Sequence, residues 1–113
     1  MKMTETQERV LRAFLEDPTA ARYGYDLMRA ARVQSGTLYP MLARWAEDGL
    51  VESEWEAVAD AGRGGRPPRK FYRLTAEGVR VARLELAEQD AARRAAVAAR
   101  PATPTLRPAD GRG

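Results

Sequence analysis

Apolar side chains near the start of the chain recur every three or four residues, the spacing of one face of an α-helix. The positions in this series are Met3, Val10, Leu11, Phe14 and Leu15. Thr4 followed by Gln7 has the form of a capping box, and Asp17-Pro18 is a helix-ending signal. The pattern therefore predicts a first helix over residues 4–16.

Two shorter apolar series follow and predict two more helices. The second helix is marked by Leu27, Met28 and Ala31. The third carries apolar residues at i, i+3, i+4 and i+7, which are Leu38, Met41, Leu42 and Trp45. Ser35 is the expected N-cap of the third helix, and Gly49 is expected just past its end. The tight connection between the two helices is typical of a helix-turn-helix.

The pattern then changes to the period of a β-strand. Over residues 50–56, Val51 and Trp55 alternate with glutamates, which predicts a strand with a polar, solvated outer face. A loop rich in glycine and proline occupies residues 57–69, and the aromatic residues 70–74 form a second short strand. Two strands joined by a long loop make a hairpin, or wing.

The last element is a long, alanine-rich helix over residues 76–99, with Thr75 as its cap. Because no later element is available to cover this helix, it suggests pairing with a partner chain. Residues 100–113 hold prolines and glycines and predict a disordered tail. The fold class is mainly α with a small β-wing, and residues 1–75 form the winged helix-turn-helix.

Composition narrows the function classes. The 113 residues fit one domain plus a tail, and they include no Cys and no His. Disulfides, Cys/His metal sites and nucleophile–His pairs are therefore excluded. An enzyme that uses carboxylates alone stays open as an alternative, but no residue spacing indicates one, so we expect no metal, no cofactor and no enzyme activity. No apolar run approaches the roughly 20 residues of a membrane span, and no signal peptide is evident. A cytoplasmic location is expected.

The net charge of +3 is unevenly distributed. Residues 1–59 hold 7 basic and 10 acidic groups, giving −3. Residues 60–73 hold 5 basic groups and 1 acidic group, giving +4. Residues 74–113 hold 7 basic and 5 acidic groups, giving +2. The positive charge therefore gathers in the wing, as a phosphate-binding surface requires, although a solvated basic loop has the same composition.

The third helix offers polar side chains on the face opposite its apolar one. They are Gln34, Ser35, Thr37, Tyr39 and Arg44. A recognition helix presents its N-terminal residues to the major groove, where hydroxyl and amide groups bond to base edges or phosphates. The alternative is that Ser35 and Thr37 only cap the helix while Tyr39 lies on the surface. The basic wing that follows favours the groove interpretation.

The wing supplies four cations among glycines and prolines, Arg63, Arg66, Arg69 and Lys70. Beside a duplex such side chains neutralise phosphates or enter the minor groove. Trp45 and Trp55 are candidates for a small-molecule effector pocket at a dimer interface, and ordinary core packing is the alternative for both.

Four stretches together resemble the PadR family of bacterial transcriptional regulators. They are residues 23–27 (YGYDL), 35–42 (SGTLYPML), 47–51 (EDGLV) and 65–78 (GRPPRKFYRLTAEG). The combination of a G-T-L-Y-P helix start with an R-K-F-Y-x-L-T-x-E-G wing is specific, and the similarity covers about residues 7–90. The single helix after the wing is similar to the short-tailed members of the family.

The resemblance implies a homodimer that binds double-stranded DNA, with the third helix in the major groove and the wing on the backbone or minor groove. It implies that helix 76–99 pairs with its partner. Most members are repressors, and some release DNA when they bind a phenolic or aromatic effector, so a repressor with a small aromatic effector is the implied function. Ser35, Thr37, Tyr39, Lys70 and the arginines near Lys70 are the DNA contacts that carry over. The absence of a longer C-terminal region puts effector sensing in doubt. A winged-helix protein-interaction module is the alternative function, and neither the operator nor the regulated genes follow from the sequence.

Overall fold

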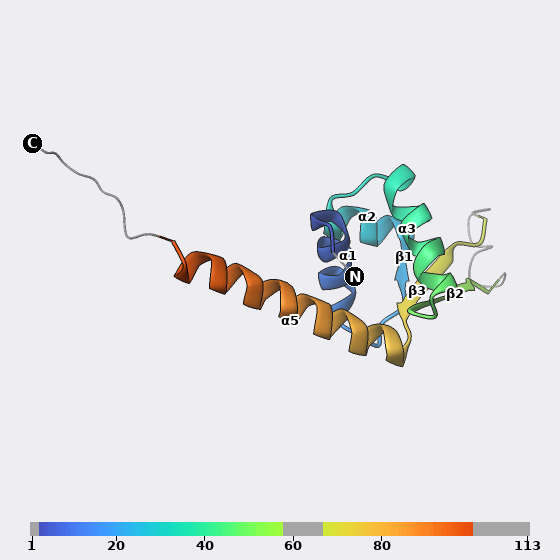
Figure 1. Ribbon diagram of the computed structural model, residues 1–113. Coiled ribbons are helices and arrows are strands. Elements are labelled where there is room, and N and C mark those ends of the chain that lie inside the picture. The colour runs from blue at the N-terminus through green and yellow to red at the C-terminus, as the bar shows by residue number, and fades with distance from the viewer. Residues whose placement is uncertain (1–2, 58–66, 101–113) are drawn as a thin grey trace, which may run out of the picture.

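The computed structural model describes residues 3–57 and 67–100, and Figure 1 shows their arrangement. The helices are α1 (Glu5–Leu15), α2 (Gly24–Ala31), α3 (Ser35–Glu47) and α5 (Ala76–Ala98). The strands are β1 (Arg22–Tyr23), β2 (Val51–Trp55) and β3 (Lys70–Leu74). The predicted order of three helices, a wing and a long last helix is confirmed, and so is the mainly helical fold class. The predicted tail, apart from Arg100, lies outside the described residues.

The wing is part of a three-stranded antiparallel sheet in the order β1-β3-β2. The strand β1 pairs Arg22 with Tyr72 and Tyr23 with Phe71, and was not predicted. The predicted hairpin is confirmed by the antiparallel pairing of β2 with β3, and β1 adds a third strand to it. A segment of two residues is too short to show a period-two pattern, so only its pairing with β3 makes it a strand.

The core lies where α1, α2 and α3 meet the sheet. Its most deeply buried side chains are Trp45, Phe14, Leu27, Leu38, Leu42 and Val10. The capping box of α1 is present, because Gln7 N–H donates to Thr4 Oγ1 at 3.1 Å and Thr4 N–H donates to Gln7 Oε1 at 3.0 Å. The apolar series read from the sequence therefore mark the helical faces that are buried.

The start of α3 differs from the prediction. Its N-cap is Gln34, no side chain caps the helix, and Ser35 is the first helical residue. The end of α3 is as predicted, because Gly49 has a φ of +76° directly after the C-cap Asp48. Ser35 is thus a surface residue of the first turn, and its hydroxyl is not needed to begin the helix.

The helix α5 begins against the domain and then extends beyond it (Figure 1). Thr75 caps it, since Gly78 N–H donates to Thr75 Oγ1 at 2.9 Å. Ala82 and Leu86 are buried, whereas every residue from 91 to 100 is exposed. Within residues 3–57 and 67–100, no helix is long and apolar enough to span a membrane.

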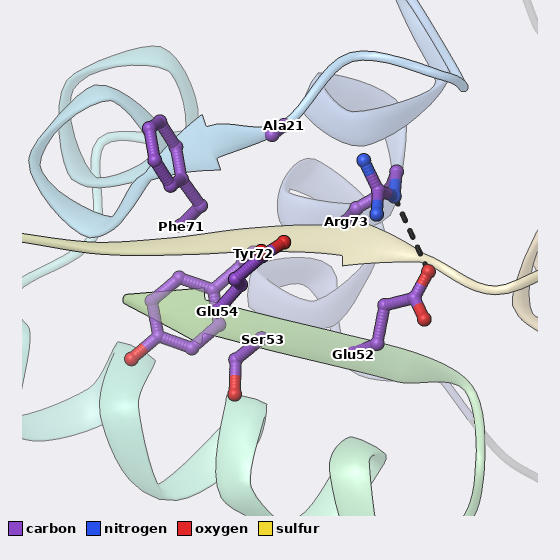
Figure 2. A pocket seen from close by; sticks show the side chains of 7 residues that line it. All are labelled: Ala21, Glu52, Ser53, Glu54, Phe71, Tyr72 and Arg73. Atoms are coloured by element: carbon purple, nitrogen blue, oxygen red, sulfur yellow. Dashed lines mark hydrogen bonds and ion pairs between the residues drawn. The ribbon is translucent and has the colours of Figure 1, made fainter. Parts of the chain in front are cut away.

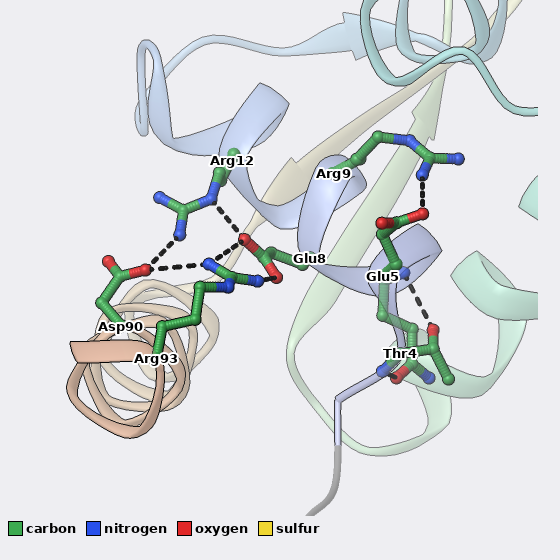
Figure 3. Close-up of polar contacts among 8 residues, drawn as sticks. Thr4, Glu5, Glu8, Arg9, Arg12, Asp90 and Arg93 are labelled. Atoms are coloured by element: carbon green, nitrogen blue, oxygen red, sulfur yellow. Dashed lines mark hydrogen bonds and ion pairs between the residues drawn. The ribbon is translucent and has the colours of Figure 1, made fainter. Parts of the chain in front are cut away.

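A group of charged side chains joins α1 to the middle of α5 (Figure 3). Arg93 donates two hydrogen bonds to Glu8, at 2.6 and 3.2 Å. Arg12 donates to Glu8 at 3.0 Å and to Asp90 at 2.9 Å. The hydrogen bond from Arg93, and then the one from Arg12, lower the pKa of the nearly buried Glu8 carboxyl against the opposing effect of its burial. This network fixes the direction in which α5 leaves the domain.

Candidate nucleic-acid interface

One side of α3 packs into the core and the other is open. Leu38, Leu42 and Trp45 are buried. The residues predicted to meet DNA are all exposed: Gln34, Ser35, Thr37, Tyr39 and Arg44. Within the described ranges, neither Ser35 nor Thr37 makes a side-chain hydrogen bond. The interpretation of these two hydroxyls as helix caps is therefore wrong, and both remain available to a ligand.

Tyr39 connects α3 to its neighbours while keeping part of its ring exposed. The ring lies so close to Gly24, the first residue of α2, that a Cβ there would collide with it. Its centroid is 6.3 Å from that of Tyr72 on β3. Burial is the main cause of the raised pKa of Tyr72, and Tyr39 adds to it. Glycine at position 24 thus lets Tyr39 of α3 pack closely against α2.

A cleft of about 330 Å³ lies between this tyrosine and the wing. We call it the wing cleft, and its walls include Tyr25, Tyr39, Trp55, Lys70 and Tyr72. The Lys70 ammonium lies 5.5 Å from the centre of the Trp55 ring and 5.9 Å from that of Tyr72. Among the described residues, no carboxylate is within ion-pair distance of Lys70. The cleft therefore combines aromatic faces with a cation that is free to meet a phosphate.

Arg69 is adjacent to Lys70 in sequence but is engaged by the wing itself. Its guanidinium lies 3.7 Å from the centre of the Tyr23 ring, and Nη2 is 3.6 Å from Glu56 Oε2. The Tyr23 hydroxyl donates to Glu56 at 2.7 Å, and this hydrogen bond is the main cause of the raised pKa of Tyr23. Glu56 is only 7% exposed, so the expected solvated acidic face is wrong at this position.

The two sides of the sheet carry different groups. In Figure 2 the side chains of Ser53 and Tyr72 point toward α3, whereas Phe71 and Arg73 point away from it. On that outer side Arg73 Nε donates to Glu52 at 3.2 Å, and a shallow cavity of about 110 Å³ remains. Phe71 stacks on Tyr23 with ring centroids 4.5 Å apart. The outer side thus holds β1, and the inner side faces α3.

The remaining predicted site residues are not brought together. Arg63 and Arg66 lie outside the described residues. Trp45 is 2% exposed in the core, whereas Trp55 is 64% exposed at the wing cleft. The two tryptophans therefore do not line one common pocket within a single chain, and Trp45 follows the core-packing alternative. Sequence reasoning missed Tyr25 and Tyr72 as walls of the cleft, because which side of the sheet Tyr72 faces depends on the strand register.

Comparison with known proteins finds similarity to one family of regulators. The family model described as the transcriptional regulator PadR-like family matches residues 14–84. No curated protein matches the sequence. A crystal structure of a PadR family transcriptional regulator from Eggerthella lenta DSM 2243 is similar, with 27% identity, a TM-score of 0.68 and coverage of 87% of each chain.

Two further solved structures are similar. A PadR-like transcription factor from Bacteroides fragilis has 27% identity and a TM-score of 0.58, covering 84% of this chain and 92% of its own. The PcaV transcriptional regulator from Streptomyces coelicolor, solved in complex with its natural ligand, has 25% identity and a TM-score of 0.58. That alignment covers 86% of this chain and 64% of PcaV.

Proposed function

The chain belongs to the PadR-like family of transcriptional regulators, and from this premise we propose that it is a homodimeric, sequence-specific DNA-binding repressor. In this proposal α3 enters the major groove, and the wing formed by β2 and β3 meets the backbone or the minor groove. The observation that carries it is the open N-terminal face of α3, where unpaired Ser35 and Thr37 hydroxyls lie on the same helix as Tyr39.

The wing cleft supports the same assignment. Its unpaired Lys70 ammonium lies beside the partly exposed ring of Tyr39. A duplex whose major groove receives α3 would place its phosphates within reach of this cation. Arg69 contributes differently, because it holds Glu56 and Tyr23 in place and so stabilises the shape of the wing. Arg63 and Arg66 remain predicted phosphate contacts.

The homodimer rests on α5. Leu84 and Val97 are 51% and 63% exposed, and the helix extends away from the domain. At 1.5 Å per residue the helix is about 35 Å long, and every residue from 91 onward is exposed. The two side chains lie on different faces of the helix, so a second copy that packs against one face would bury one of them. Two-fold symmetry would present two recognition helices to two half-sites.

We also propose a small aromatic effector. PcaV, a regulator of similar fold, was solved in complex with its natural ligand, which supports a ligand response. In this chain Trp55, rather than the buried Trp45, has an open ring against which a ligand could stack.

The experiment that tests the central claim is fluorescence anisotropy with labelled duplex DNA from the upstream region of the gene, at several salt concentrations. Tight binding that is selective over a scrambled duplex and falls steeply with salt is the expected result. A reporter gene behind the same region should lose expression when the protein is present. Weak, unselective binding would contradict the proposal and favour a protein-interaction module.

A further inference from the structure

The end of α2 holds an arginine in a backbone conformation that arginine rarely adopts. Arg32 is the C-cap of α2, with φ 53° and ψ 55°, in the left-handed region. It is the one non-glycine residue with positive φ in residues 3–57 and 67–100. Glycine is the usual residue at such a position, because a Cβ is strained there. The site therefore carries a long cationic side chain at a cost to the fold.

A groove of about 470 Å³ lies beside this residue, between α2 and the start of α3. Met28 and Val33 are half-buried and form its apolar part. Arg29, Arg32 and Ser35 are exposed around it. In the part of the chain that the structure describes, no carboxylate is within ion-pair distance of either arginine. Two uncompensated cations thus flank the N-terminus of the recognition helix.

Tyr25 makes this groove continuous with the wing cleft, because its ring lines both. It is 61% exposed, and the Arg29 guanidinium lies 5.8 Å from its ring centre. A single surface therefore runs from Lys70, past Tyr39 and Tyr25, to Arg32. Tyr39 lies between the cation at one end of this surface and the two at the other.

We propose that Arg29 and Arg32 form a second phosphate-binding site for duplex DNA, on the side of α3 away from the wing. This inference rests on the proposed DNA-binding function and extends it. The major groove is bounded by two phosphate backbones about 12 Å apart, so a helix inserted between them has one on each side. Lys70 meets the backbone on the wing side, and the two arginines meet the other. This contact accounts for an arginine at position 32 despite the strain of its left-handed backbone.

The decisive variant is Arg32→Gly, because it should weaken DNA binding without lowering the stability of the fold. Glycine accepts the left-handed conformation, so the melting temperature should stay equal or rise. The slope of log affinity against log salt concentration should become shallower by about 0.9, the contribution of one phosphate contact. Arg29→Ala should reduce the slope by a similar amount. Arg32→Lys keeps the positive charge and should therefore retain most of the wild-type salt slope.

Arg83→Ala is the matched control, since Arg83 is exposed on α5 and lies away from the groove. The readout is anisotropy with the upstream duplex and a scrambled duplex, together with thermal unfolding of each variant. Loss of affinity should be equal on both duplexes, because phosphate contacts carry no sequence information. An unchanged salt slope in Arg32→Gly and Arg29→Ala, with salt-dependent binding by the wild type, would overturn this inference alone. Absence of salt-dependent binding by the wild type would overturn the proposed function as well.

Discussion

The carbonyl oxygen of Leu50 lies against the Cα of Gly78, closer than any Cβ at position 78 would permit. The same oxygen accepts a hydrogen bond from Thr75 N–H at 3.0 Å. The Thr75 hydroxyl donates to Gly49 O at 2.7 Å while it caps α5. The first turn of α5 therefore packs directly against the turn between α3 and β2. The close packing at the start of the long helix therefore depends on one glycine.

We expect Gly78→Ala to lower the free energy of unfolding by about 1–3 kcal/mol, the usual cost of overpacking. The obstacle is a backbone oxygen, which cannot rotate away as a side chain would. Urea unfolding followed by circular dichroism measures the change. Gly36→Ala is the control, because a Cβ at this exposed position in α3 meets nothing within 4 Å. It should stabilise the protein by about 0.5–1 kcal/mol. Equal shifts in the two variants would show that the close approach to Leu50 is unimportant.

Lys70→Ala should weaken binding to all duplexes alike and make the salt slope shallower by about one unit. The reason is that, in the proposed complex, the ammonium meets a phosphate rather than a base. Arg66→Ala is predicted to behave in the same way. The measurement is anisotropy on a set of operator variants at several salt concentrations. A loss confined to particular base substitutions would assign Lys70 to base recognition instead.

Thr37→Ala and Tyr39→Phe should change which operator variants bind best. A side chain that reads a base edge contributes about 1–3 kcal/mol of discrimination at one base pair. Tyr39→Phe is informative because the ring would keep its packing against Gly24 and Tyr72 and lose only the hydroxyl. Its melting temperature should therefore match that of the wild type. A uniform loss across all duplexes would place both side chains on the backbone.

The sequence predicts most of the fold because the decisive signals are local. The capping box of Thr4 and Gln7 and the left-handed Gly49 each depend on residues within one turn of a helix. The strand β1 was missed because it exists only through pairing with β3. Ser35 was misplaced by one position, since Gln34 can begin a helix without a side-chain cap. Element boundaries therefore follow from the sequence to within a residue or two.

The site is less predictable, because register and tertiary contacts decide where its side chains point. Arg69 and Lys70 are equivalent in sequence, yet Arg69 is engaged by Glu56 and Tyr23 whereas Lys70 lies over Trp55. Trp55 shares the alternation of Val51 but lies beyond the reach of the core and is exposed. Arg32 carried no signal at all, since its left-handed backbone is visible only in the structure.

The network around Glu8 predicts a specific response to acid. Because Arg93 lowers the pKa of Glu8 in the folded protein, the folded value is below the unfolded value of about 4.3. The carboxylate therefore stabilises the fold above that pH, and this contribution is lost as the pH falls through the folded pKa. Glu8→Gln should be less stable than the wild type at neutral pH and should lose less stability on acidification. Melting temperatures between neutral pH and about pH 3 measure both effects.

Glu88→Gln is the control for this titration, since Glu88 is exposed on α5. Its melting temperature should follow that of the wild type throughout. A Glu8→Gln curve that runs parallel to the wild type would contradict the assigned role of Arg93. It would also show that the charged contact between Glu8 and Arg93 does not set the direction of α5.

The exposed side chains of α5 predict how the proposed dimer can be separated. Leu84 and Leu86 are two residues apart and so lie on nearly opposite faces of the helix, one 51% exposed and the other 6%. A charge at position 84 leaves the domain contact of Leu86 intact but cannot be buried against a second copy without a large penalty. Leu84→Asp should therefore shift the molar mass from dimer to monomer in light scattering after gel filtration. The circular dichroism spectrum should retain its helical signal.

The same variant should also lose affinity for a full upstream operator, because one recognition helix can occupy only one half-site. Binding to a single half-site duplex should be nearly unchanged, which separates loss of dimerisation from damage to α3. Val97→Asp tests the opposite face of α5. Val97 lies on the same face as Leu86, but in the part of the helix that the domain does not cover. Dissociation by Val97→Asp alone would place the partner on that face. A wild-type protein that is monomeric at the concentrations that bind DNA would contradict the homodimer.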